Sequence, residues 1–280
     1  MTLTWPVVLA VLFGALLHAS WNALVKSSTD KALDTALINL LASFLAVPLV
    51  MLVGWPPADA WPFIAASILI HIGYYVALSG AYEHGDLGLT YPLMRGTAPL
   101  LVALSASVTL GETLSPLSWV GVVAISAGVL TLGLGRHAFD APKAVRFALV
   151  NALIIATYTV VDALGVRATG NAMQYVAALF LLDGWPFALI VFARRTWNVG
   201  PYIRKRWPIG LGGALASIGS YGVALWAMTQ APVATVAALR ETSVLFAALL
   251  GVWFLKEVFT VRRAVGTMVI VSGVMALRMG

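Results

Sequence analysis

The chain has 280 residues, of which 61% are hydrophobic and only 10% are charged, and its mean hydropathy is +0.93. Soluble domains are typically about 45–50% apolar and about 25% charged, so this chain has too few polar residues to cover a soluble surface. The composition indicates an integral membrane protein and excludes a soluble enzyme. The absence of cysteine excludes disulfides and thiol catalysis. We attribute the net charge of +6 to orientation in the membrane and expect no nucleic-acid partner.

Ten apolar runs follow one another along the chain, each close to the roughly 20 residues that a helix needs to cross a bilayer. The runs predict an all-α protein with ten transmembrane helices, because lipid offers no partner to unpaired backbone groups and no barrel strands are visible. The breaks are short and rich in Pro, Gly and charge, as in Gly54–Pro57 and Arg204–Pro208. The predicted helices are residues 4–25, 34–53, 61–83, 87–110, 116–135, 144–168, 172–193, 207–229, 233–255 and 261–278.

Lysine and arginine are distributed unevenly between the two ends of these helices. The loops after the first, third, fifth, seventh and ninth helices hold 13 of the 17 basic residues, and Arg95 and Arg240 lie within spans. Cytoplasmic loops are enriched in Lys and Arg, so both termini are predicted to face away from the cytoplasm. The first run lacks the basic segment of a signal peptide and is expected to be a retained helix.

Two segments 145 residues apart share a pattern: Leu93-Met94-Arg95-Gly96-Thr97 and Ala238-Leu239-Arg240-Glu241-Thr242. The same offset pairs Glu112 with Glu257, Gly121 with Gly266, and Gly128 with Gly273. Five helices per half is an odd number, so the second half enters the membrane in the opposite sense. We predict two inverted five-helix repeats, residues 1–140 and 141–280, an organisation typical of alternating-access transporters. A duplication that builds only a scaffold is the alternative.

The blocks that begin at Arg95 and Arg240 resemble the EamA pattern of the drug/metabolite transporter superfamily, in which a helix ending in Gly-Glu leads into a glycine-bearing last helix. The resemblance covers essentially the whole chain and implies ten helices in two inverted halves. The aromatic content is most similar to that of YddG-type amino-acid exporters. Lys256 stands where the pattern usually has Gly, a change expected to alter the hairpin but not the fold.

Charged residues within spans need a reason, because each is unfavourable by at least about 2.5–3.5 kcal/mol at the bilayer centre. Arg95 and Arg240 are predicted to lie on opposite sides of the midplane, with Asp162 at the depth of Arg240. Two interpretations stay open: Asp162 and Arg240 form a structural pair beside Glu241, or the guanidinium groups bind a substrate carboxylate. Because Arg95 has no acid at its own predicted depth, we expect it to contact the substrate.

Prolines mark further candidate positions. Asp183 precedes Gly184-Trp185-Pro186, where a kink would create a polar niche for a proton or an amine; a neutral or hydrogen-bonded carboxyl is the alternative. Pro92 and Pro99 suggest that the run 87–110 bends as a gate. Glu112 and Glu257 are expected to cap hairpins or pair with arginines.

The run 61–83 carries Ser67, His71, Tyr74, Tyr75 and Tyr82 at three- and four-residue spacing, on one helical face. Lipid does not favour such polar groups, so we expect this stripe to face a cavity, with packing alone as the alternative. Aromatic residues of both halves would together line a chamber for an amphiphilic solute. The predicted substrate-binding residues are Trp21, His71, Tyr74, Tyr75, Tyr82, Arg95, Tyr158, Tyr221 and Trp226.

Enzyme motifs such as HExxH, GxSxG and a phosphate-binding GxxxxGK[ST] do not occur, and the four histidines are scattered. We expect no enzymatic activity, cofactor or metal. We predict a monomeric secondary transporter of the bacterial inner membrane, whose partners are the lipid bilayer and a small-molecule substrate. By resemblance it exports amino acids, neutral or aromatic, or related small metabolites. Another metabolite or drug, including nucleoside-like solutes, is the alternative substrate class, and a passive channel is the alternative mechanism.

Overall fold

The computed structural model describes residues 3–85, 87–133, 141–195, 199–255 and 260–280, and this part of the chain is almost entirely helical, without strands. A short 3-10 turn, Ala58–Ala60, precedes the third helix. The helices are α1 (Trp5–Lys26), α2 (Lys31–Val53), α3 (Trp61–His84), α4 (Leu87–Thr109), α5 (Pro116–Gly133), α6 (Pro142–Thr169), α7 (Ala172–Arg194), α8 (Val199–Gln230), α9 (Val233–Arg240), α10 (Ser243–Leu255) and α11 (Val261–Met279).

All ten predicted runs are helical, which confirms the all-α membrane fold class. Among the described residues, eight stretches of helix are long and apolar enough to cross a membrane. The stretches α4 and α11 are not among these eight, because Arg95 and two prolines lower the hydropathy of α4 and three arginines lie in α11. Both nevertheless pack within the bundle, α4 against α6 and α11 against α5.

The predicted run 233–255 is divided into α9 and α10 by a turn at Glu241 and Thr242. The backbone N–H groups of these two residues bond to carbonyls three positions earlier, at 3.0 and 3.1 Å, and the Thr242 hydroxyl donates to the Leu239 carbonyl at 2.7 Å. Three-residue bonding is tighter than that of an α-helix and marks an interruption of the helix.

Helix α8 begins at Val199, so the prediction of a break at Arg204–Pro208 is wrong. The helix continues through Pro208 because its first turns are held against α2. The Tyr202 hydroxyl donates to an Asp34 carboxylate oxygen at 2.7 Å, and Arg206 forms an ion pair with the same carboxylate. These contacts stabilise two helical turns that composition alone would assign to a loop.

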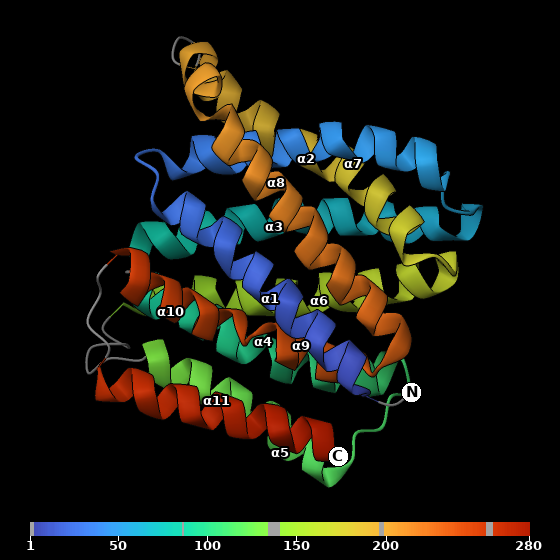
Figure 1. The fold of residues 1–280 in the computed structure, drawn as a ribbon, viewed down its shortest axis with the longest axis vertical. Helices are drawn as coiled ribbons and strands as arrows, with labels where there is room; N and C mark the ends of the chain where they lie inside the picture. Colours follow the sequence, from blue (N-terminus) through green and yellow to red (C-terminus); the bar gives the residue numbers. More distant parts are fainter. Residues whose placement is uncertain (1–2, 86, 134–140, 196–198, 256–259) are drawn as a thin grey trace.

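The helices pack in pairs that join the two halves of the chain. In Figure 1, α2 lies beside α7 at one end of the long axis and α5 lies beside α11 at the other. Between them, α3 packs on α6 and α1 packs on α8. This set of four pairs is unchanged when the first and second halves are exchanged.

The pair α5 and α11 shows the same relation at the level of single residues. A Cβ added to Gly128 would lie 2.6 Å from Cγ1 of Ile270, and a Cβ added to Gly273 would lie 2.7 Å from Cγ1 of Ile125. At the 145-residue offset these two contacts are equivalent. Glycine therefore permits close approach of the two helices at both places.

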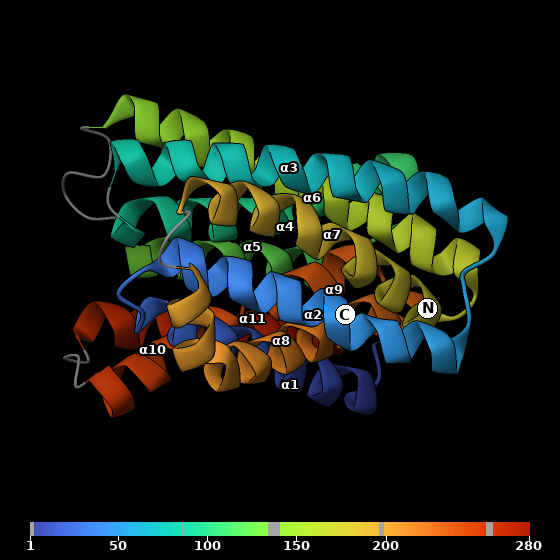
Figure 2. The same ribbon diagram turned by 90° about the horizontal axis from the view of Figure 1, so that it is seen from above.

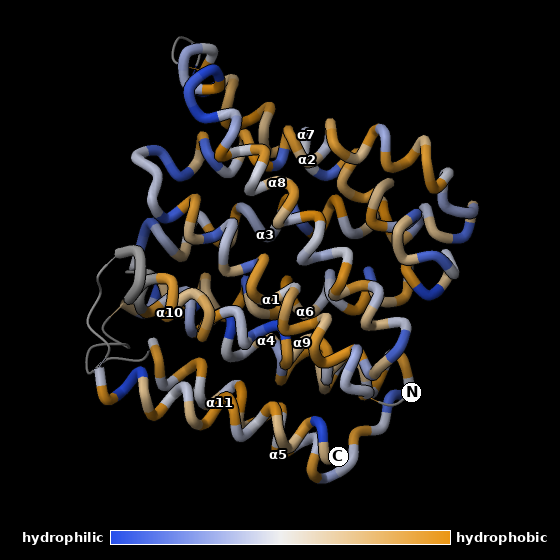
Figure 3. Tube along the Cα trace, in the orientation of Figure 1, coloured by the Kyte–Doolittle hydropathy of each residue, from blue (hydrophilic) through white to orange (hydrophobic). Residues whose placement is uncertain are grey.

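The start of α1 and the end of α11 lie at the same end of the bundle, opposite the ends of α1, α3, α5, α7 and α10 (Figure 1). Figure 3 shows that the most hydrophilic segments gather mainly at the two ends of the helices, as expected for helices that cross an apolar layer. Which end faces the cytoplasm stays a prediction from the distribution of lysine and arginine.

Candidate functional site

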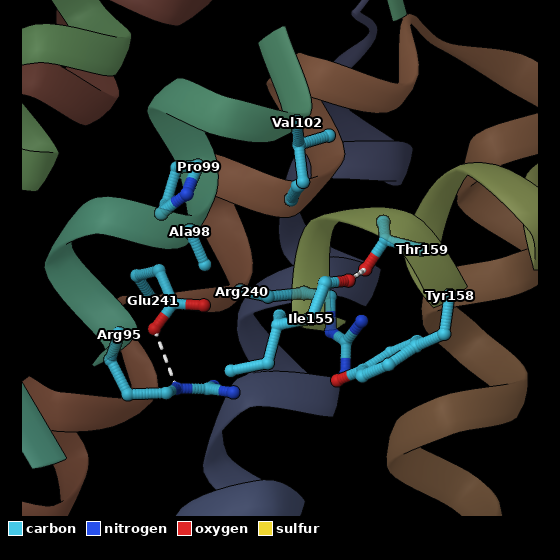
Figure 4. Close-up of a pocket in the computed structure, with 10 residues that line it drawn as sticks. Arg95, Ala98, Pro99, Val102, Ile155, Tyr158, Thr159, Arg240 and Glu241 are labelled. Atoms are coloured by element: carbon cyan, nitrogen blue, oxygen red, sulfur yellow. Dashed lines mark hydrogen bonds and ion pairs between the residues drawn. The ribbon is translucent and has the colours of Figure 1, made fainter. Parts of the chain in front are cut away.

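A small cavity lies between α4, α6 and the junction of α9 with α10 (Figure 4). Its volume is about 10 Å³, which is room for about one water molecule. The first half contributes one wall and the second half the others. The lining residues are Arg95, Ala98, Pro99, Val102, Ile155, Tyr158, Thr159, Ala237, Arg240 and Glu241.

Arg95 is paired with Glu241 across this cavity, with 2.8 Å between Nε and Oε2. Both side chains are buried, with exposed fractions of 9% and 6%. The prediction that Arg95 has no acidic partner is therefore wrong. It assumed an unbroken helix from residue 233 to 255, whereas the turn after Arg240 directs the Glu241 carboxylate toward α4.

One part of the Arg95 side chain remains without a partner. The Nη2 atom is buried and makes no hydrogen bond within the described part of the chain. In Figure 4 the side chains of Arg95, Tyr158 and Arg240 point toward a common space. A buried donor without a protein partner is unfavourable by about 1–3 kcal/mol, so the site favours a ligand that accepts from it.

Arg240 does not pair with Asp162, which overturns the predicted structural pair. Its guanidinium carbon lies 5.2 Å from the centre of the Tyr221 ring, a cation–π arrangement. The Asp162 carboxylate instead accepts hydrogen bonds from the Tyr175 hydroxyl at 2.8 Å and from the Tyr221 hydroxyl. Tyr221 thus lies between the two groups expected to meet, with its ring toward Arg240 and its hydroxyl toward Asp162.

Tyr175 is a site residue that sequence reasoning missed. Asp162 is fully buried on α6, and a buried carboxylate requires hydrogen-bond donors. That requirement was the available signal, but it does not say which of the many hydroxyls in the chain supplies the donor. The bond to Tyr175 also joins α6 to α7.

Part of the predicted stripe on α3 reaches the cavity wall through Tyr158. The ring of His71 stacks on Tyr158 with 4.5 Å between centroids, and Tyr74 meets Tyr158 edge-on at 6.2 Å. The His71 Nδ1 lies 2.8 Å from the Ser67 carbonyl oxygen, which fixes the ring on its own helix. His71 and Tyr74 therefore support a wall residue and do not line the described cavity themselves.

The remainder of the stripe packs elsewhere. Tyr75 stacks on Phe187 of α7 at 4.4 Å, and its hydroxyl accepts a hydrogen bond from the Asn39 amide at 3.0 Å. Tyr82 is 38% exposed near the end of α3. The contacts of Tyr75 agree with packing between helices, which was the alternative to a position facing a cavity.

Two further predicted residues lie away from the cavity lining. Trp21 meets the His18 ring edge-on at 5.3 Å, and Trp226 is 40% exposed on α8. The contact of His18 with Trp21 was not predicted, because a single histidine in an apolar run carries no distinguishing pattern.

The segment that follows Asp183 brings α7 close to α2. A Cβ on Gly184 would lie 2.3 Å from the Asn39 carbonyl oxygen and from the Ser43 hydroxyl, so glycine lets the two backbones meet. Asp183 makes no ion pair within the described residues, and α7 continues through Pro186.

The two prolines of α4 occupy different surroundings. Pro92 is buried within the helix, and Pro99 contributes to the cavity wall. The helix remains continuous through both. Their predicted role in a bending gate is untested.

Glu112 joins three elements near the end that carries the termini. Its carboxylate accepts from Arg167 at 2.6 Å and from the Val233 backbone N–H at 2.8 Å. The prediction that Glu112 pairs with an arginine is confirmed. The backbone group that it caps belongs to the first turn of α9 and not to a hairpin. Its equivalent, Glu257, lies outside the described residues.

Four ion pairs among the described residues join the first half to the second, and they lie at three levels of the bundle. Asp30 binds Arg195 at 3.2 Å near the basic end. The pair of Asp34 with Arg206 lies near the basic end, the pair of Arg95 with Glu241 lies at the cavity, and Arg167 binds Glu112 near the opposite end.

Comparison with known proteins shows a similarity to one family in the second half of the chain and a shared fold over nearly all of it. Residues 142–279 match the EamA-like transporter family. One solved crystal structure superimposes with a TM-score of 0.76 over 96% of this chain and 95% of that chain, at 21% sequence identity. At this identity the likeness shows a shared fold. The stretch from α6 to α11 is therefore similar to the EamA-like transporter family.

Proposed function

We propose that the protein is a secondary transporter of the drug/metabolite transporter superfamily that moves amino acids or closely related small metabolites out of the cell. One observation carries the substrate class. Arg95 is buried at a cavity between the halves, has a donor without a protein partner, and is paired with a carboxylate from the other half. The EamA-like domain at residues 142–279 supports the transporter class.

The site is suited to a zwitterion. Arginine binds a carboxylate through two parallel hydrogen bonds, so a substrate carboxylate competes with Glu241 for Arg95. If the substrate were a simple anion, Glu241 would be left buried without a cation, which is strongly unfavourable. An amino acid avoids this penalty because its ammonium group pairs with Glu241 while its carboxylate pairs with Arg95.

The substrate side chain would meet the apolar and aromatic wall. Val102, Ile155 and Tyr158 line the cavity beside the charged pair, and Tyr158 is held in place by His71. This combination favours neutral or aromatic amino acids. Other metabolites or drugs, including nucleoside-like solutes, form the second candidate class.

Transport would proceed by alternating access between two inverted repeats, residues 1–140 and 141–280. The exchange-invariant helix pairs and the equivalent glycine contacts of Gly128 and Gly273 support this organisation. A cavity with room for about one water must widen to admit an amino acid. Widening at one end would separate Asp34 from Arg206, and widening at the other would separate Glu112 from Arg167.

The proposed setting is the bacterial inner membrane, with the protein as a monomer and both termini outside the cytoplasm. The unequal distribution of lysine and arginine supports this orientation. A C-terminal phosphatase fusion is expected to be active, and a C-terminal fluorescent protein that matures only in the cytoplasm is expected to remain dark. The opposite pattern would reverse the orientation.

Counterflow in proteoliposomes tests the function. Vesicles loaded with a single unlabelled amino acid should accumulate the same amino acid in labelled form, with saturable kinetics, if it is a substrate. Arg95→Gln and Glu241→Gln should each reduce counterflow at least tenfold. Arg204→Gln serves as the control, because it removes the same charge as Arg95→Gln from an exposed residue outside the cavity lining.

The possible outcomes separate the candidates. If no amino acid shows counterflow but nucleosides or organic acids do, with saturable kinetics, the substrate belongs to the second candidate class. Non-saturable flux without exchange would indicate a passive channel. Normal counterflow in both cavity variants would remove Arg95 and Glu241 from the substrate site.

A further inference from the structure

A groove of about 660 Å³ lies between α3 and α6, apart from the central cavity. The two helices run side by side along one edge of the bundle, as Figure 2 shows. Apolar residues form most of the groove, including Val76, Val150 and Ile154, and the first two are more than half exposed. Three basic side chains stand at one end of the groove: His84, Lys143 and Arg146.

Glycine and a phenylalanine shape the groove. A Cβ on Gly73 would meet only Ile154, at 3.8 Å, so the middle of the groove remains open. Near the basic end, a Cβ on Gly80 would lie 2.6 Å from the Phe147 ring, which packs directly on the α3 backbone there. The His84 ring stacks on the Phe147 ring, with 5.6 Å between the ring centroids.

Contacts among the described residues do not explain the positive charge at the basic end of the groove. Lys143 and Arg146 are exposed and make no ion pair within the described residues. Both lie near the amino terminus of α6, where the helix dipole disfavours cations. The first turn of α6 contains no acidic residue, and its N-cap residue, Ala141, supplies no side-chain cap. An external anion would offset both the side-chain charges and the dipole.

We propose that this groove is a binding site for an anionic phospholipid. Its acyl chain lies along Val76, Val150 and Ile154, and its phosphate is held by Lys143 and Arg146. The groove matches such a lipid along its length, because it is apolar where the acyl chain would lie and cationic where the phosphate would lie. The cations lie at the same end as the other basic loops, which the positive-inside rule assigns to the cytoplasmic leaflet, where anionic lipids attract basic side chains.

The charges also argue against a second copy of the chain as the occupant. Two copies in one membrane share an orientation, so a symmetric contact through this groove would bring Lys143 and Arg146 of both copies to the same level. Like charges at such a contact repel each other. A lipid with no net charge is disfavoured for a related reason, because its own cation competes with the protein for the phosphate.

Native mass spectrometry of the delipidated protein tests the proposal with two probes of equal chain length, phosphatidylglycerol and phosphatidylcholine. The wild type should bind phosphatidylglycerol more tightly. In Lys143→Gln/Arg146→Gln its affinity should fall about tenfold to thirtyfold, given the usual contribution of two basic residues near a lipid surface. The matched control, Arg204→Gln/Lys205→Gln, removes the same charge from exposed positions at the same end and should change the affinity less than twofold.

A steric variant tests the apolar part independently of charge. Val76→Trp places an indole in the groove at an exposed position, so it should fold normally and lower the binding of both lipids. Equal affinity of the wild type for the two lipids would overturn the proposal. Equal losses in the two double variants would also overturn it, as would a wild-type dimer that Val76→Trp converts to a monomer.

Discussion

Helix α4 and the pair formed by α9 and α10 are equivalent at the 145-residue offset, yet one is continuous and the other is interrupted. The continuous helix contains two prolines, Pro92 and Pro99, whereas residues 233–255 contain none. Proline removes a backbone hydrogen bond, and it is usually the first explanation for a broken helix. Here the interruption instead accompanies Thr242, whose hydroxyl bonds to the backbone, and Glu241, whose carboxylate reaches the other half.

A single pair of equivalent positions makes the two arginines different. Glu241 is equivalent to Gly96, where a Cβ would lie 2.7 Å from Cγ of Leu130. The first half therefore needs glycine for packing and has no carboxylate to offer to Arg240. The second half supplies a carboxylate to Arg95. The two halves thus form matching helix pairs but carry unequal charge at the cavity.

The largest effect should follow from removing the carboxylate of that unequal pair. Glu241→Gln leaves Arg95 buried without a countercharge, and loss of one partner of a buried pair is unfavourable by about 3–5 kcal/mol. The melting temperature in detergent should fall sharply. Adding Arg95→Gln to the same chain should restore part of the stability. A single variant as stable as the wild type would show that Arg95 has another partner.

The glycine contacts of α5 and α11 should behave equally, in contrast to the arginines. Gly128→Ala and Gly273→Ala each place a methyl group against an isoleucine of the facing helix. Overpacking of this kind typically destabilises by about 1–3 kcal/mol. Thermal unfolding of the two variants should give losses of similar size, because the two contacts have nearly the same distances. A strong effect of only one substitution would break the equivalence.

Removing the second arginine should have a smaller effect than removing Glu241. Arg240→Gln loses a cation–π contact with Tyr221, which is worth about 0.5–2 kcal/mol. Asp162 keeps its two tyrosine donors in this variant, so a further Asp162→Asn change should not rescue stability. Rescue, measured as a higher melting temperature of the double variant, would restore the pairing that the structure excludes.

The smallest effect is expected at the interruption itself. Thr242→Val keeps the shape of the side chain and removes its hydrogen bond to the Leu239 carbonyl, a change of about 0.5–1.5 kcal/mol. Hydrogen exchange should show slower opening at residues 241–245 if the chain gains a more regular helix, with Thr229→Val as a control at an exposed helix end. If hydrogen exchange does not change, the Thr242 hydroxyl is not the cause of the interruption between α9 and α10.

The apolar runs predicted the membrane fold well because hydrophobic length and backbone satisfaction dominate in lipid. The prediction failed where a tertiary contact decides the local structure. The extension of α8 depends on Asp34, which is 172 residues from Arg206 in sequence. The turn at Glu241 likewise depends on contacts that periodicity does not contain.

For the candidate site, we predicted most of the charged and aromatic residues from their depth along the predicted helices, but we paired them incorrectly. One cavity is lined by five of the predicted residues: Arg95, Pro99, Tyr158, Arg240 and Glu241. Their partners could not be predicted because depth along a helix ignores the direction of each side chain. Arg240 and Asp162 were matched by depth, yet the Tyr221 side chain lies between them.

The shared location of the two termini has a consequence for how the chain can be connected. A linker from Gly280 to the start of the chain would remain on one side of the bundle (Figure 1). New ends could then be opened between α5 and α6, because the end of α5 and the start of α6 lie at the opposite side (Figure 1). Such a circular permutant would be synthesised with its second half first and would begin insertion from the other face of the membrane. Its assembly would therefore reveal whether either half can fold before its counterpart is present.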